Sequence, residues 1–62
     1  MRKLEPDEYA LLELLAMEPL SYIPPLHQSV AEALIARGLT VKQGQHWYAT
    51  ANGLRVVGRA LH

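Results

Sequence analysis

The chain has 62 residues, half of them hydrophobic, no cysteine, and six acidic side chains that balance six basic ones. This length predicts one small domain over residues 1–62, and the lack of cysteine excludes disulfides and thiolate metal sites. No apolar run approaches the ~18 residues of a membrane-spanning helix and the first eight residues (MRKLEPDE) hold no apolar signal region, so we expect a cytoplasmic protein with no membrane contact.

The zero net charge conceals an uneven distribution along the chain. Residues 1–34 hold all six acids and two bases, whereas residues 35–62 hold four bases and no acid. A basic surface on one part of a domain is typical of a nucleic-acid binder. The same imbalance also arises by chance in a small domain, and both interpretations are kept.

Residues 6–17 are predicted to form the first helix. Pro6 suits the first helical position, because the amide it lacks would be unpaired there. Asp7 and Glu8 would lie at the positive end of the helix dipole, and the helix should stop before Pro19. Its apolar stripe is expected to consist of Leu11, Leu12, Leu14 and Leu15.

The segment 19–25 (PLSYIPP) holds three prolines, which exclude a regular helix. Leu20, Tyr22 and Ile23 are apolar enough to pack inward from a loop or a single turn.

A second long helix is predicted at residues 26–37. Leu26, Val30 and Leu34 recur every four residues and would mark its core face, with Ala31 to the side or outside. Gly38 should end the helix in the left-handed conformation.

Residues 39–50 are predicted to form a two-stranded hairpin. Leu39 should fold back onto Leu34, and residues 43–45 (QGQ) can turn the chain. Trp47 should face the helices, and Tyr48 should face outward.

A last helix is expected at residues 51–61, with Thr50 as its N-cap. Leu54, Val57 and Leu61 would form its core stripe. Arg55 and Arg59 are four residues apart and would share one exposed face.

Two segments together resemble the winged helix-turn-helix domain. The first is residues 33–39 (ALIARGL), and the second is residues 47–53 (WYATANG), with Thr50 and Gly53 at the threonine and glycine of the wing-to-helix pattern. The resemblance implies an α+β winged-helix fold with helices at residues 6–17, 26–37 and 51–61 and a two-stranded hairpin at residues 39–50. One departure is that the short helix expected before the recognition helix is reduced here to a loop or a single turn.

The resemblance also implies a small DNA-binding protein, a transcriptional regulator of bacterial or phage type, that binds double-stranded DNA as a dimer. The second helix would approach base edges and the hairpin would contact the backbone. A solvated helix face or an ordinary polar turn would carry the same residue types. The candidate DNA-binding residues are His27, Gln28, Ser29, Arg37, Lys42, Gln43, Gln45, His46, Arg55 and Arg59.

A protein-interaction or dimerisation module on the same fold is the alternative. It is favoured by the zero net charge, the reduced middle helix and a high hydrophobic content, and it leaves a homodimer or another protein as partner. The histidines His27, His46 and His62 have no metal-ligand spacing, and no nucleophile has a base at a motif distance. We therefore expect no enzymatic activity, no metal and no cofactor.

Overall fold

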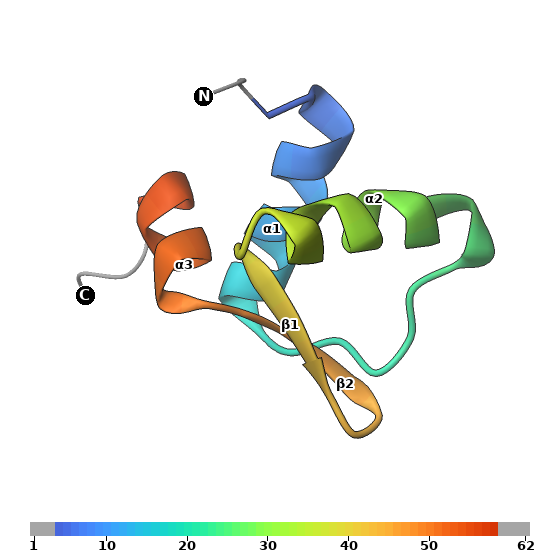
Figure 1. Ribbon diagram of the computed structural model, residues 1–62. Coiled ribbons are helices and arrows are strands. Elements are labelled where there is room, and N and C mark those ends of the chain that lie inside the picture. The colour runs from blue at the N-terminus through green and yellow to red at the C-terminus, as the bar shows by residue number, and fades with distance from the viewer. Residues whose placement is uncertain (1–3, 59–62) are drawn as a thin grey trace.

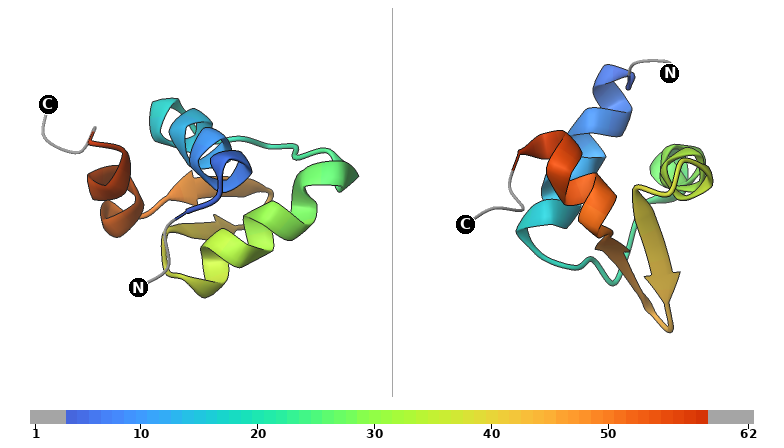
Figure 2. Two further views of the ribbon diagram at one scale, coloured as in Figure 1. Left: turned by 90° about the horizontal axis from the view of Figure 1, so that it is seen from above. Right: turned by 60° about the vertical axis from the view of Figure 1, so that its left-hand side comes forward.

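The computed structural model describes residues 4–58, which form three helices and one two-stranded antiparallel sheet. In chain order these are α1 (Pro6–Met17), α2 (Pro25–Ala36), β1 (Thr40–Gln43), β2 (His46–Ala49) and α3 (Ala51–Val57) (Figure 1). α1 packs against both α2 and α3, which lie on its two sides, and the hairpin extends below them (Figures 1 and 2). The predicted α+β class is confirmed.

The predicted bounds are close, with corrections at three elements. α1 has the predicted bounds, α2 begins and ends one residue earlier than predicted, and the strands are shorter than residues 39–50. α3 ends at Val57, not near residue 61, because Gly58 adopts the left-handed conformation with φ 73°. The predicted helical positions 59–61, with Arg59 and Leu61, lie outside the described residues.

The connector between α1 and α2 contains no helix. Leu20 forms an isolated antiparallel bridge with Trp47: the amide of Trp47 donates to the carbonyl of Leu20 at 2.8 Å, and the reverse bond measures 3.1 Å. The connector is therefore paired with the free edge of β2 at this one position. Ile23 is buried as expected, but Tyr22 is exposed, so its predicted inward packing is wrong.

The core face of α2 differs from the prediction. Leu34 is fully buried, but Leu26 is 83% exposed and Ala31 is buried. Ala31 and Leu34 are three residues apart and define the buried line of α2, and Leu26 lies roughly a third of a turn away from that line. In α1, likewise, Leu14 is exposed although the other three leucines of the stripe are buried.

The end of α2 and the start of α3 are joined at four residues, Gly38, Leu39, Thr50 and Gly53, which we call the junction. Gly38 has φ 74°, and the amide of Leu39 donates to the carbonyl of Leu34 at 3.0 Å, as in a Schellman stop. The hydroxyl of Thr50 donates to the carbonyl of Gly38 at 2.7 Å and accepts from the amide of Gly53 at 3.0 Å. Thr50 thus caps α3, as predicted, and also ties it to the end of α2.

The junction requires glycine at position 53, because there is no room for a Cβ atom there. A Cβ at this position would overlap the carbonyl oxygen of Leu39 and press on the side chain of Leu12. By contrast, a Cβ at Gly38 would meet open space, although the positive φ there strains any other residue.

We expect Gly53→Ala to destabilise the fold by more than about 2 kcal/mol, because α3 must move off Leu39. Gly38→Ala is the matched control and should cost about 1–2 kcal/mol through backbone strain alone. Urea unfolding followed by circular dichroism measures both. Equal losses for the two variants would contradict the close approach at Gly53.

The hairpin places one polar side chain in the core. Thr40 pairs with Ala49 and Lys42 with Trp47, so all four share the inner face, and Tyr48 lies on the outer face as predicted. Thr40 is only 2% exposed, and its Oγ1 has no hydrogen-bond partner within residues 4–58. A buried hydroxyl without a partner costs stability.

Thr40→Val should therefore stabilise the domain by about 1 kcal/mol, because it removes a buried unpaired hydroxyl and keeps the shape. Thr50→Val is the matched control with the same chemical change. It should destabilise by about 1–2 kcal/mol, because Thr50 caps α3. Thermal melts of the two variants should shift in opposite directions, and a destabilising Thr40→Val would show that its hydroxyl is satisfied.

Candidate functional site

The candidate DNA-reading residues lie on the first turn of α2. His27, Gln28 and Ser29 are exposed, and the first turn holds no acidic residue. The side-chain amide of Gln28 already makes one hydrogen bond within the chain, since its Nε2 donates to the carbonyl of Ile23 at 3.3 Å. This end of α2 is accessible, and its own side chains bring no formal positive charge.

The hairpin tip carries four more of the candidate residues. Lys42, Gln43, Gln45 and His46 are all exposed. The ammonium of Lys42 lies 4.5 Å from the ring centre of Trp47, its cross-strand partner, in a cation–π contact. Lys42 is thus held on the inner face of the hairpin, toward α2.

Arg37 has a structural partner within the fold. Its guanidinium lies 3.5 Å from the carboxylate of Glu8, and the two side chains are 18% and 7% exposed. The same carboxylate oxygen accepts the amide of Glu5 at 2.8 Å, which completes the start of α1. Arg37 therefore joins the end of α2 to the start of α1, a role that treating Glu8 as a helix-start residue alone did not reveal.

The candidate bases do not meet on one surface. Arg55 lies on α3, where it donates to the side chain of Asn52, and α3 is separated from α2 by α1 (Figure 2). Arg59 lies outside the described residues. Residues 4–58 contain three bases against six acids, and one base is the paired Arg37, so this part of the chain forms no continuous basic face.

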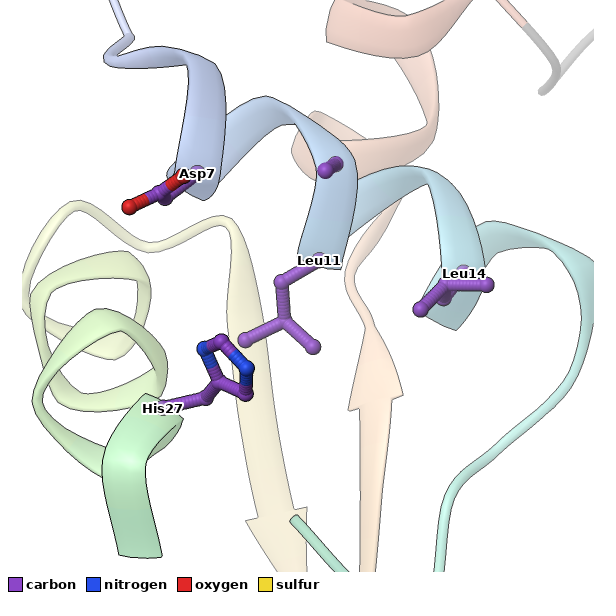
Figure 3. A pocket seen from close by; sticks show the side chains of 5 residues that line it. Asp7, Leu11, Leu14 and His27 are labelled. Carbon is purple, nitrogen blue, oxygen red and sulfur yellow. The ribbon is translucent and has the colours of Figure 1, made fainter. Parts of the chain in front are cut away.

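A hollow lies between α1 and the first turn of α2, and we call it the α1–α2 groove. Its volume is about 150 Å³, and Figure 3 shows Leu11 and His27 pointing toward each other across it, with Asp7 and Leu14 at its ends. The residues that line the groove are Asp7, Ala10, Leu11, Leu14 and His27. Its floor is apolar, and its two polar groups are one carboxylate and one imidazole.

Exposed apolar side chains border this groove on α1. Ala10, Leu14 and Met17 are spaced four and three residues apart and so share one flank of the helix. Leu14 is 53% exposed and Met17 is 68% exposed. The apolar surface of the groove therefore continues along α1 beyond the hollow itself.

Leu26 lies one residue before the part of α2 that lines the groove. Leu26, Val30 and Arg37 share one flank by helical spacing, and Arg37 reaches Glu8 of α1 from that flank. The flank that carries Leu26 therefore faces toward α1. Leu26 also directly precedes His27, which lines the hollow.

A second groove runs between α2 and the hairpin, with a volume of about 200 Å³. It is more polar than the first groove, because its lining includes Glu32 and Lys42. Their opposite charges leave the groove with no net charge from these two residues. Its lining residues are Gln28, Ala31, Glu32, Ile35, Lys42 and Trp47. A carboxylate in this groove disfavours a polyanionic ligand such as DNA.

Two specific features are absent from residues 4–58. No group of three His, Cys, Asp or Glu side chains there can hold a metal ion, and no helix there is long and apolar enough to cross a membrane. The chain matches no protein-family model, and the comparisons with curated proteins and with solved structures found no match. The choice between functions therefore depends on the chemistry of the two grooves.

The α1–α2 groove was not predicted from the sequence, although one signal pointed to it. Leu11, Leu12, Leu14 and Leu15 occupy more than one face of a three-turn helix, so they cannot all reach a single core. At least one of these leucines therefore has to be exposed. Which one is exposed depends on how α2 crosses α1.

Proposed function

We propose that this domain is a protein-interaction module whose binding site is the α1–α2 groove. The observation that carries the proposal is an apolar hollow lined by exposed Leu14, with exposed Met17 and Leu26 within one helical turn of its lining residues. Exposed apolar residues scattered singly need no explanation, but a cluster beside a hollow is typical of an interaction site.

The hollow has the size of an anchor pocket. A volume of about 150 Å³ accommodates one large aliphatic or aromatic side chain, and burying such a side chain contributes about 1.5–3 kcal/mol. A few buried anchors of this kind supply most of the energy of a protein interface. Asp7 and His27, at the border of the apolar floor, would fix the orientation of the partner.

A synthetic amphipathic peptide of leucine and lysine is the probe for this proposal. Its leucines can enter the hollow, and its lysines can meet Asp7. We expect the titration to move the amide NMR signals of Ala10, Leu14 and His27, and Leu14→Asp to weaken binding by at least about tenfold. Val56→Asp, at an exposed apolar position on α3, is the matched control and should leave the affinity unchanged.

Two results would argue against the proposal. One is a peptide that causes no shifts in this region, either in the wild type or in the variant Leu26→Asp. The other is equal weakening by Leu14→Asp and Val56→Asp, which would indicate nonspecific apolar adhesion.

A small DNA-binding regulator is the second candidate function. The order of helix, loop, helix, hairpin and helix is compatible with a winged helix. The exposed first turn of α2 favours this interpretation, because it leaves the side chains there free to reach a ligand. Its weakness is electrostatic. Phosphate contacts supply most of the affinity for DNA, and in residues 4–58 only Lys42 and Arg55 are exposed bases.

We therefore expect a short mixed-sequence DNA duplex to bind weakly at low salt and not measurably at physiological salt. Fluorescence anisotropy with a labelled duplex measures this, with Lys42→Ala as the test variant and Leu14→Asp as its control. Saturable binding at physiological salt that Lys42→Ala weakens by about tenfold, and Leu14→Asp does not, would assign the function to DNA binding instead.

A further inference from the structure

We propose that the partner in the α1–α2 groove is a second copy of this chain, which forms a two-fold symmetric dimer. In this dimer, Leu26 of each copy enters the groove of the other. The inference rests on the proposed function, because it uses the same groove and names its occupant.

The first argument is that the surface is self-complementary in shape. A two-fold interface requires each copy to present both the projecting group and the pocket that receives it on one face. Leu26 projects from the first turn of α2 with 83% of its surface exposed, and the next residue, His27, lines the hollow. The projection and one wall of the pocket are therefore both on the first turn of α2.

The second argument is the match between the projection and the pocket. The hollow of about 150 Å³ exceeds the volume of one leucine side chain and is floored by Ala10, Leu11 and Leu14. When each copy inserts Leu26 into the groove of the other, the Leu26 side chains of both copies are removed from water. This insertion also covers Leu14 and Met17, which border the groove and are more than half exposed in the isolated chain.

The third argument is the pair of polar groups in the groove. The lining contains one carboxylate, Asp7, and one imidazole, His27, on opposite helices (Figure 3). A two-fold axis through the groove brings Asp7 of each copy toward the partner's His27. The two contacts are identical, and both join a hydrogen-bond acceptor to a donor.

The surface of the chain is sufficient for such a dimer. A stable interface buries about 800 Å² on each partner, which is under a fifth of the 4377 Å² accessible on this chain. A chain of 62 residues also buries a smaller fraction of its surface than a larger domain, so association adds stability that the isolated core lacks.

Sedimentation velocity over a range of concentrations tests the inference on the full chain. We expect the wild type to be a dimer at micromolar concentration and Leu26→Asp to be a monomer with the same circular dichroism spectrum. Val56→Asp, on α3, is the control and should remain dimeric. The melting temperature should rise with concentration for the wild type and the control, but not for Leu26→Asp.

A charge exchange provides a second, independent measurement. Asp7→His alone places two imidazoles at each contact and should weaken the dimer by about tenfold. The double variant Asp7→His/His27→Asp restores one carboxylate and one imidazole per contact and should recover most of that loss. A general loss of folding would not be rescued in this way.

A wild type that is monomeric at every concentration would overturn the inference, and so would a dimer that survives Leu26→Asp. The Leu26→Asp monomer, titrated with the leucine–lysine peptide, separates this failure from that of the proposed function, because it lacks the projection and keeps all five residues that line the hollow. Peptide binding to Leu26→Asp together with a monomeric wild type would overturn the dimer alone. No peptide binding to Leu26→Asp would count against the groove as an interaction site, and with it against the dimer.

Discussion

The contact between Gly53 and the backbone of Leu39 is the constraint on which the remaining structure depends. Only a residue without a Cβ lets α3 approach the carbonyl of Leu39 this closely. The approach puts Thr50 within reach of Gly38, so one hydroxyl caps α3 and satisfies the end of α2. The two ends of the hairpin are thereby held together, and the hairpin packs against both α1 and α2. The segments that resemble a winged helix, residues 33–39 and 47–53, are the ones that meet here.

The ion pair between Glu8 and Arg37 fixes the other side of α2. It joins the start of α1 to the end of α2, while the opposite end of α2 is connected to α1 through an irregular segment. The two helices are therefore tied at Arg37 and leave a hollow near His27. The pair also takes one of the few basic residues out of the exposed surface. Folding and phosphate binding compete for the same arginine, and the fold uses it.

The distribution of apolar and charged groups favours a protein surface over a nucleic-acid surface as the partner. Lys42 is held above Trp47 in a groove that also contains Glu32, and Arg55 is on α3, on the other side of α1. In contrast, exposed Leu14 lines one apolar hollow, and exposed Met17 and Leu26 lie within one turn of its lining residues. A small domain without disulfides gains stability when such a surface is covered. Apolar burial and the matched pair of Asp7 and His27 make a second copy of the chain the simplest partner for that hollow.

The sequence by itself determined the elements, because their limits depend on local chemistry. Pro6 and Pro19 bound α1, Gly38 ends α2, and Thr50 and Gly53 start α3; each acts within a few residues of itself. It also named the exposed residues of α2 and of the hairpin tip, since polar side chains beside an apolar line face water. Only the tertiary structure decided which apolar residues stay outside. Leu14 and Leu26 are exposed while Ala31 and Thr40 are buried, because burial depends on the angle at which two helices and a hairpin cross. The pairing of Glu8 with Arg37 and the groove beside it follow from that same crossing, and no local pattern in the chain specifies it.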